Sequence, residues 1–463
     1  MSSTSQRQRL ITLTLVGAAF MTGIDLFIVN VAFDQIGHDF GTKSLGSLSW
    51  ILNAYAVVFA ALLVPMGRLT DRYGRKAGFV AGLAVFTAAS LMCGFSTNVW
   101  ELVAFRGIQA IGAAAMTPTS LGLLLAALPA ERRAPAARMW ALTSALAAAL
   151  GPALGGFLVR ASWEWAFWIN VPIGIVLVAA AVRWVPDVRH NDNAPRPDLL
   201  GGVVTALGIG ALVLGIVQGN DWGWSSGRVI GSFVVAAVLV GVFVWQSLHH
   251  PAPIIEPALL KVRSFVWADI AAVLFNIGFG ISLLSRILWM QEVWGYGSIR
   301  TGLAVALGPL CVPITSLIAH RIFPNAKPGL MIAAGSMCFA LSGLWGASII
   351  TTTPSYWSTF FFPWVLGGIG VGLAMPNLVA GATSEVPPEH ASTGSGVVSM
   401  ARQIGMVLGI SVLVSIVGSG IPSLDHTRDV WFVLAGSSVA AAIAGLVMEA
   451  VRRQSAAAVL ARA

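Results

Sequence analysis

The ten residues GRLTDRYGRK, Gly67 to Lys76, place four basic side chains and one acid between two long apolar runs. The run before this stretch begins near residue 49, and the run after it begins near residue 77. A helix needs about 20 consecutive apolar residues to cross a hydrocarbon core about 30 Å thick. The stretch is therefore predicted to be a short loop between two membrane-spanning helices.

The same alternation of apolar run and short polar loop continues along the 463 residues, of which 57% are hydrophobic and only 10% charged. Soluble globular chains have about 25% charged residues, so a water-soluble fold is excluded. Strand-type alternation, which a β-barrel requires, is absent. We predict an all-α polytopic membrane protein with about fourteen transmembrane helices, beginning near residues 10, 49, 77, 99, 134, 164, 199, 227, 265, 298, 329, 355, 394 and 428.

The formal net charge of +8 follows the membrane topology. Lys and Arg lie in short loops and form no single patch, so no nucleic-acid partner is expected. With the N-terminus inside, roughly 20 of the basic residues fall on the cytoplasmic side, as the positive-inside rule requires. The first apolar run has no cleavage site and is predicted to be a retained helix. We expect a bacterial inner (cytoplasmic) membrane protein with both termini in the cytoplasm.

The segment VRHNDNAPRPD, residues 188–198, is the most polar stretch and is predicted to be a cytoplasmic linker. It divides the chain into an N-terminal six-helix bundle (1–187), two additional transmembrane helices (199–250) and a C-terminal six-helix bundle (251–463). An internal repeat supports this division, because GIQAIGAAAMTP (107–118) and GGIGVGLAMP (367–376) occupy corresponding places in the two halves.

The loop GRLTDRYGRK resembles the signature loop of the major facilitator superfamily. That resemblance implies two six-helix bundles and a cytoplasmic gate, in which Gly67 and Gly74 permit a tight turn while Asp71, Arg72 and Arg75 hold neighbouring helix ends. The alternative is a loop that only sets topology through its positive charge. A purely topogenic loop needs neither the acid nor the paired glycines.

The segment GPALGG, Gly151 to Gly156, lies within the predicted fifth span and resembles the motif that marks antiporters in this superfamily. Pro152 removes a backbone hydrogen bond, and Gly151, Gly155 and Gly156 allow another helix to approach closely. Ordinary packing of small residues is the alternative interpretation. The complete six-residue motif in the expected helix favours an exporter with an antiporter seam here.

Arg106 lies inside the fourth span, where arginine costs at least ~2.5 kcal/mol and therefore requires a partner or an aqueous cavity. Asp25 in the first span reaches a similar depth. The surrounding IDLFIVNVAFD (24–34) resembles the first-helix signature of the fourteen-helix drug:proton antiporters, although Phe27 and the Phe33-Asp34 ending depart from it. Burial raises the pKa of a carboxyl group and a nearby guanidinium lowers it, so the pair is a candidate for proton coupling. A static ion pair is the alternative.

Asp34 and Glu101 are further proton-coupling candidates near the outer rim, where a solvated carboxylate is the competing interpretation. Asp34 lies about 180° around a regular helix from Asp25, so the two would not share one site. Further polar residues within the spans are candidates for the substrate cavity, with helix packing as the alternative: Asn30, Tyr55, Gln109, Asn170, Arg286, Gln291, Asn377 and Gln403. If Arg286 faces the cavity, it favours an anionic cargo.

The chain has no GxxxxGK[ST] phosphate loop, no HExxH and no CxxC, so we expect no nucleotide motor, no metal site, no cofactor and no enzymatic activity. A proton gradient is then the energy source. The resemblance implies a monomeric, proton-coupled exporter of small lipophilic drugs, antibiotics or secondary metabolites that works by alternating access. A lipid translocase or a proton-coupled importer on the same fold remains the alternative.

Overall fold

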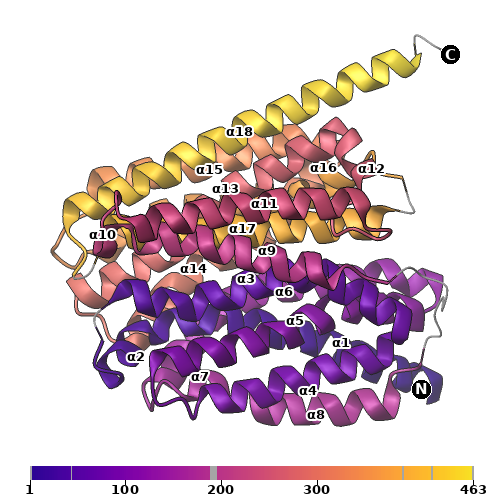
Figure 1. The fold of residues 1–463 in the computed structure, drawn as a ribbon, viewed down its shortest axis with the longest axis horizontal. Helices are drawn as coiled ribbons and strands as arrows, with labels where there is room; N and C mark the ends of the chain where they lie inside the picture. Colours follow the sequence, from indigo (N-terminus) through magenta and orange to yellow (C-terminus); the bar gives the residue numbers. More distant parts are fainter. Residues whose placement is uncertain (1–2, 43, 188–195, 388–389, 419–420, 461–463) are drawn as a thin grey trace. The chain divides into compact units, whose positions relative to one another are not determined.

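The computed structural model describes residues 3–42, 44–187, 196–387, 390–418 and 421–460, which form helices and connecting loops without a strand (Figure 1). Within these residues, fourteen helical stretches are long and apolar enough to cross a membrane, as predicted. They begin within a few residues of the expected positions. The stretches are 6–39, 45–73, 75–93, 99–127, 131–159, 165–184, 199–217, 227–249, 263–293, 298–322, 328–349, 357–383, 393–417 and 424–454.

The first span is interrupted. It combines α1 (Ser3–Ile28), the 3-10 helix η1 (Val29–Ala32) and α2 (Phe33–Asp39). The π-helices η2 (Trp289–Val293) and η3 (Trp357–Phe361) end the ninth span and begin the twelfth. The remaining helices are α3 (Leu45–Tyr73), α4 (Arg75–Cys93), α5 (Val99–Ala127), α6 (Ala130–Val159), α7 (Trp165–Trp168), α8 (Asn170–Trp184), α9 (Leu199–Val217), α10 (Gly219–Trp222), α11 (Gly227–His249), α12 (Pro257–Lys261), α13 (Arg263–Leu288), α14 (Ser298–Ile322), α15 (Pro328–Ile349), α16 (Phe362–Thr383), α17 (Ala391–Val417) and α18 (Leu424–Leu460).

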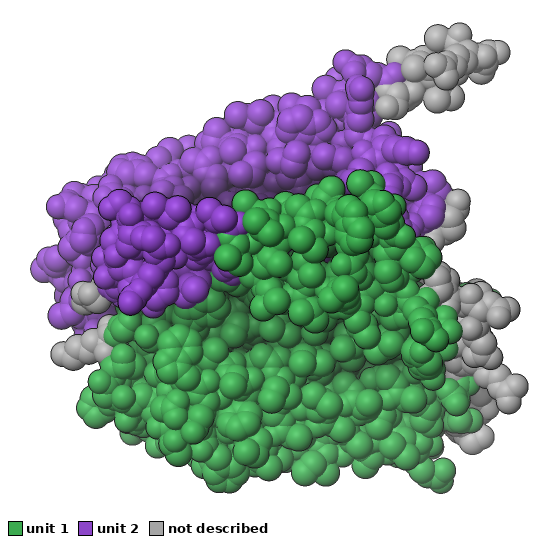
Figure 2. All heavy atoms as spheres, in the orientation of Figure 1, with its two compact units in different colours: residues 1–210, 235–254, 296–306 green, residues 211–234, 255–295, 307–463 purple. Residues whose placement is uncertain are grey.

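The chain forms two compact units, coloured separately in Figure 2. Unit 1 contains residues 1–210, 235–254 and 296–306, and unit 2 contains 211–234, 255–295 and 307–463. Helices α9, α11 and α14 therefore contribute residues to both units. The sequence-based bundle boundaries remain a prediction, and residues 188–195 of the predicted linker lie outside the described residues.

The two units repeat one helix-packing arrangement. In unit 1, α4 and α5 meet at Gly82 and Gly112, and a Cβ on Gly112 would lie only 2.6 Å from the Phe86 backbone nitrogen. In unit 2, α15 and α16 meet at Gly335 and Gly370, and a Cβ on Gly370 would lie 2.9 Å from a phenylalanine backbone nitrogen. Glycine permits these backbone approaches because it has no side chain. The structure thus supports the internal repeat, since Gly112 and Gly370 each precede a proline by six residues.

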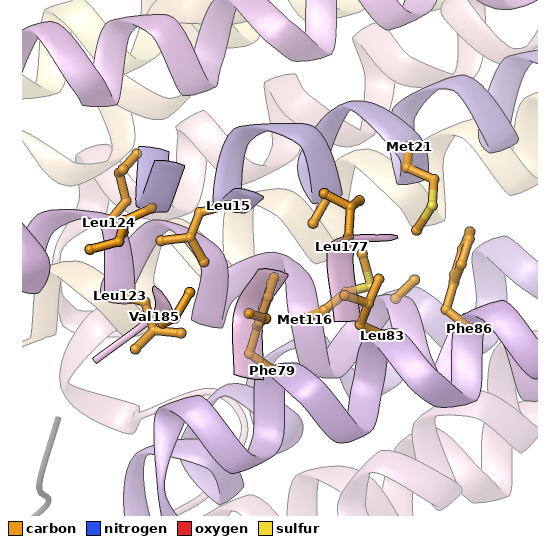
Figure 3. Packing of buried hydrophobic residues seen from close by; sticks show 14 of the residues in the cluster. Leu15, Met21, Phe79, Leu83, Phe86, Met116, Leu123, Leu124, Leu177 and Val185 are labelled. Atoms are coloured by element: carbon orange, nitrogen blue, oxygen red, sulfur yellow. The ribbon is translucent and has the colours of Figure 1, made fainter. Parts of the chain in front are cut away.

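An apolar cluster fills the middle of unit 1 between α1, α4, α5 and α8 (Figure 3). It extends from Phe79 and Leu124, near the GRLTDRYGRK loop, to Met21 and Phe86, each one turn before a polar residue of the site described below. These side chains are almost completely buried. The cluster therefore forms an apolar layer on the loop side of that site.

Candidate functional site

Asp25 and Arg106 form a buried ion pair in unit 1. Arg106 Nη1 donates to Asp25 Oδ2 at 2.5 Å, and both side chains are 0% exposed. α1 supplies the acid and α5 the base, so the packing of two helices creates the pair. The predicted partnership is confirmed as a contact.

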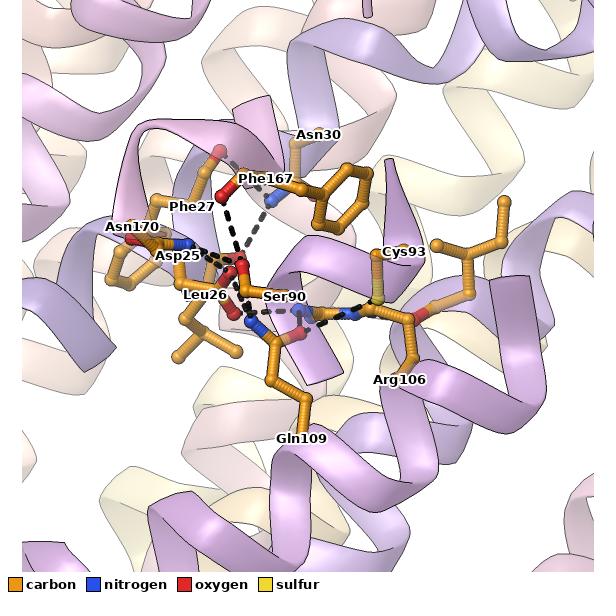
Figure 4. A network of polar contacts seen from close by, with 11 residues as sticks. Asp25, Leu26, Phe27, Asn30, Ser90, Cys93, Arg106, Gln109, Phe167 and Asn170 are labelled. Atoms are coloured by element: carbon orange, nitrogen blue, oxygen red, sulfur yellow. Dashed lines mark hydrogen bonds and ion pairs between the residues drawn. The ribbon is translucent and has the colours of Figure 1, made fainter. Parts of the chain in front are cut away.

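The second carboxylate oxygen of Asp25 also has partners (Figure 4). Gln109 Nε2 and Asn170 Nδ2 each donate to Oδ1 at 2.9 Å, from α5 and α8. Both amides also donate to Ser90 Oγ on α4, at 3.1 Å and 3.0 Å. Ser90 was not predicted from the sequence, because one serine in an apolar helix carries no signal of its depth. Four helices therefore contribute to one closed hydrogen-bond network.

The side chain of Arg106 is also supported by α3, the second span. Its Nε donates to the Ile51 carbonyl oxygen at 3.2 Å, and its guanidinium lies 4.1 Å from the centre of the Tyr55 ring. Gln109 Oε1 accepts a further bond from Nη1 at 2.7 Å. Cation–π contact and hydrogen bonding together fix the guanidinium in front of Asp25.

The geometry assigns several predicted cavity residues to this network. Tyr55, Gln109 and Asn170 are almost completely buried and contact Arg106 or Asp25. Asn30 is buried nearby, but its amide donates to the Leu26 and Phe27 carbonyls of its own helix. In this structure Tyr55, Gln109 and Asn170 contact the Asp25–Arg106 pair, whereas Asn30 hydrogen-bonds to a turn of its own helix.

The glycines of the GPALGG segment contact the helix that carries Asp25. A Cβ on Gly151 would lie 2.8 Å from Phe27 Cβ, and one on Gly155 would lie 2.9 Å from the Ile28 carbonyl oxygen. Both contacts follow Asp25 directly along α1. Gly156 and Pro152 instead approach the backbone at the start of α14, at residues 298–302. Helix α6 therefore packs on the Asp25 helix and on the first turns of α14, which belong to unit 1.

The predicted GRLTDRYGRK loop is shorter than expected: residues 67–73 form the end of α3, Arg75 and Lys76 begin α4, and Gly74 alone lies between the two helices. Gly74 has φ +124°, a conformation that disfavours other residues, and Gly67 lies beside Pro118 of α5. Asp71 Oδ1 accepts from Arg75 Nε at 2.6 Å, one turn apart and partly exposed. Arg72 lies with its guanidinium 5.5 Å from the Tyr73 ring.

Further contacts tie the same loop to other elements of unit 1. Arg68 Nη1 donates to the Pro253 carbonyl at 2.6 Å, and Lys76 Nζ donates to the Val182 carbonyl of α8 at 3.0 Å. Thr70 and Thr119 share a hydroxyl hydrogen bond of 2.9 Å between α3 and α5. The loop thus does more than carry positive charge.

Asp34 and Glu101 lie apart from the Asp25 network. Asp34 is exposed in the first turn of α2, beyond η1. Glu101 is exposed, and its Oε2 accepts 2.8 Å bonds from the backbone and hydroxyl of Thr97. With Asn98 as N-cap, these bonds close the first turn of α5. Capping of the N-terminus of α5 therefore explains the contacts of Glu101 without a role in proton transfer.

The second-half candidates lie on four different elements of unit 2. Asn377 donates to the Leu373 carbonyl of its own helix at 2.8 Å, and Gln291 lies in η2. Gln403 is half-buried about three turns inside α17. Arg286 on α13 is fully buried. Within the described ranges, no group of three or more His, Cys, Asp or Glu side chains is arranged to hold a metal ion.

The buried ion pair, the glycine contacts and the loop occur here on fourteen spans, and the family model described as Major Facilitator Superfamily matches residues 15–410. The chain belongs to this superfamily. A likeness to solved transporters agrees: the crystal structure of the POT family transporter PepTSo aligns with a TM-score of 0.73, 14% identity and 97% and 98% coverage of the two chains. This likeness shows the fold. A multi-pass membrane transporter fold is thus established.

Three sequence relatives of this chain are named as resistance or export proteins. Multidrug resistance protein Stp of Mycobacterium tuberculosis (strain CDC 1551 / Oshkosh) is 32% identical over 89% of this chain and 76% of that protein. Cephamycin export protein CmcT of Amycolatopsis lactamdurans is 32% identical over 87% and 84%. Methylenomycin A resistance protein of Streptomyces coelicolor (strain ATCC BAA-471 / A3(2) / M145) is 28% identical over 92% and 89%.

Proposed function

We propose that this member of the superfamily is a proton-coupled exporter of small lipophilic drugs, antibiotics or secondary metabolites. It works as a monomer in a bacterial cytoplasmic membrane, with both termini in the cytoplasm. The relatives named for multidrug resistance and export support the direction and the cargo class. The observation that carries the proton coupling is the enclosed Asp25–Arg106 pair against the GPALGG segment. A proton crossing ~100 mV supplies about 2.3 kcal/mol for export.

The coupling works through the distance between α1 and α5. While Arg106 Nη1 contacts Asp25 Oδ2, the cation stabilises the ionised carboxylate and opposes proton uptake. Separation of the two helices removes this stabilisation, and the carboxyl group of Asp25 then takes up a proton. Re-formation of the pair releases it. In this cycle Asp25 carries the proton, and the return of Arg106 causes Asp25 to release it.

The GPALGG segment transmits the movement. Its glycines leave no side chain between α6 and the backbone of α1 just beyond Asp25. Pro152 cannot donate a backbone hydrogen bond, so α6 bends at low cost there. A shift of α6 during alternating access therefore moves the Asp25 helix. The GRLTDRYGRK loop stabilises one of the two conformations through Asp71–Arg75 and Arg68.

The test is proton flux in liposomes. We expect wild-type protein to release protons when lipophilic cargo is added, and Asp25→Asn to move cargo down its gradient without proton flux. Asp34→Asn is the matched control, because it removes an exposed carboxylate from the same span. Cargo movement with no proton flux in the wild type, or normal coupling in Asp25→Asn, contradicts the proposal. Movement of fluorescent phospholipids in place of drugs would identify a lipid translocase instead.

A further inference from the structure

The guanidinium of Arg286 is a buried cation in unit 2, and three of its five N–H groups are unused. The side chain is 0% exposed, and Nη1 donates to the carbonyl and hydroxyl oxygens of Ser282, at 2.8 Å and 2.6 Å. Nε and Nη2 are buried without a hydrogen-bond partner among the described residues. No described carboxylate forms an ion pair with it, in contrast to Arg106.

Two tryptophans border this guanidinium. The ring centres of Trp364 on α16 and Trp431 on α18 lie 4.5 Å and 4.9 Å from the Arg286 Cζ. Trp431 is held by its own bond from Nε1 to Ser285 Oγ, at 3.0 Å. Aromatic faces stabilise the positive charge but do not accept the N–H groups that lie in the guanidinium plane. The arrangement holds the cation firmly and leaves one edge unsatisfied.

The unsatisfied edge has a specific chemistry. Nε–H and one Nη2–H of arginine point in parallel from the same side of the planar group, and this fork matches the two oxygens of a carboxylate. Leaving a buried charge without a counter-charge in a membrane protein is costly, and arginine does not escape the cost by losing its proton. The site therefore favours a ligand that brings a carboxylate and an apolar body suited to tryptophan.

We propose that the Arg286 Nε–Nη2 edge, flanked by Trp364 and Trp431, binds the carboxylate of a lipophilic monocarboxylic cargo. The inference rests on the proposed function only in assigning the carboxylate to cargo. It narrows the cargo class from lipophilic compounds in general to lipophilic anions. Asp25 has no part in it, so binding here does not depend on the proton gradient.

The test measures binding to the full-length protein in nanodiscs with matched probes: 1-naphthoate, 1-naphthamide and 1-naphthylmethylamine, by equilibrium dialysis without a pH gradient. We expect the wild type to bind the carboxylate about tenfold to hundredfold more tightly than the amide, as two charge-assisted hydrogen bonds predict. Arg286→Gln should bind acid and amide equally. Arg286→Lys should retain an intermediate preference, because it keeps the charge and loses the fork.

Arg402→Gln is the control, because Arg402 is a half-buried arginine of unit 2, on α17. It should keep the wild-type preference. An equal affinity of the wild type for acid and amide, or an acid preference that survives in Arg286→Gln, overturns the proposal. Chloride that displaces 1-naphthoate as effectively as an equal concentration of unlabelled 1-naphthoate also overturns it, in favour of an inorganic anion site. If Arg286→Gln does not fold, Arg286→Lys decides: an undiminished preference is then the contradicting result.

Asp25→Asn separates this proposal from the proposed function. The variant should keep the preference for 1-naphthoate even though it loses proton flux. A wild type that prefers the acid but shows no proton flux would contradict proton coupling and leave the Arg286 site standing. A wild type that shows proton flux but binds acid and amide equally would contradict the Arg286 site and leave proton coupling standing.

Discussion

Arg106 in unit 1 and Arg286 in unit 2 are both fully buried and both lie beside aromatic rings, yet their partners differ. Arg106 contacts the carboxylate of Asp25 and an amide from its own helix. Among the described residues, Arg286 hydrogen-bonds to Ser282 of its own helix alone. One guanidinium has a counter-charge built into the fold, whereas the other has none among the described residues.

The internal repeat sharpens this contrast. Arg106 precedes Gly112 by six residues, and Trp364 precedes Gly370 by six, so the tryptophan occupies the place of the arginine in unit 2. The glycine contacts around Gly112 and Gly370 are nevertheless alike. The helix packing therefore does not require the Asp25–Arg106 charges. They are better explained by a task that only unit 1 performs.

The largest expected effect comes from removing Arg106. Arg106→Gln leaves the Asp25 carboxylate buried without a counter-charge, and the free energy of unfolding should fall by about 3–5 kcal/mol. Asp25→Asn in the same chain should restore part of this loss, because no unpaired charge remains. Arg286→Gln should lower stability much less, because no described carboxylate loses its partner. Reversible denaturation in one detergent measures the free energy of unfolding of all three variants. Equal losses of stability in Arg106→Gln and Arg286→Gln would contradict the distinction between the two arginines.

The next effect concerns one glycine at a helix contact in each unit, Gly151 of α6 and Gly405 of α17. A Cβ on Gly151 would lie 2.8 Å from Phe27 Cβ, and one on Gly405 would lie 2.3 Å from the Val273 carbonyl oxygen and 2.9 Å from Asn276 Cβ. Alanine at either place should cost about 1–3 kcal/mol of stability through overpacking. Only Gly151→Ala should also reduce protons released per cargo molecule in liposomes, because only its neighbour helix carries Asp25. A similar loss of coupling in Gly405→Ala would show that both contacts serve general packing.

A smaller effect is expected in the loop. The Asp71–Arg75 pair is partly exposed, so Asp71→Asn should change stability by only about 0.2–1 kcal/mol. The transport rate should nevertheless fall several-fold if the pair stabilises one conformation. Asp425→Asn, which removes an exposed pair with Arg428 in unit 2, is the matched control for stability and should leave the rate unchanged. Equal transport rates in both variants would indicate that the loop acts only through its positive charge, which sets the membrane topology.

The smallest effect is expected at Glu101. Its carboxylate accepts bonds from Thr97 at the exposed start of α5, away from the Asp25 network. Glu101→Gln should therefore keep the wild-type proton-to-cargo ratio and transport rate in liposomes. A changed ratio would extend the proton path to the rim of unit 1 and weaken the distinction between Asp25 and the exposed acids.

The sequence was informative wherever one residue type has a large local cost. Arg106 in an apolar run demanded a partner, and Asp25 at matching depth supplied it, as the structure confirms. The sequence also indicated that Gly74 permits a tight turn, and its backbone has the expected positive φ. The GRLTDRYGRK loop was predicted to be too long, because the exact ends of helices depend on capping and packing that the apolar pattern does not reveal.

By itself, the sequence determined the number of spans, the fold class and the identity of the central ion pair, because the hydrophobic thickness of a bilayer and the cost of buried charge act on every chain alike. Only the tertiary structure decided that Ser90, Gln109 and Asn170 complete the environment of Asp25, and that Gly151 and Gly155 pack on the Asp25 helix. It also decided that Arg286 has an unsatisfied edge. These facts depend on helix rotation and on contacts between residues far apart in the chain, which a pattern of apolar runs leaves open.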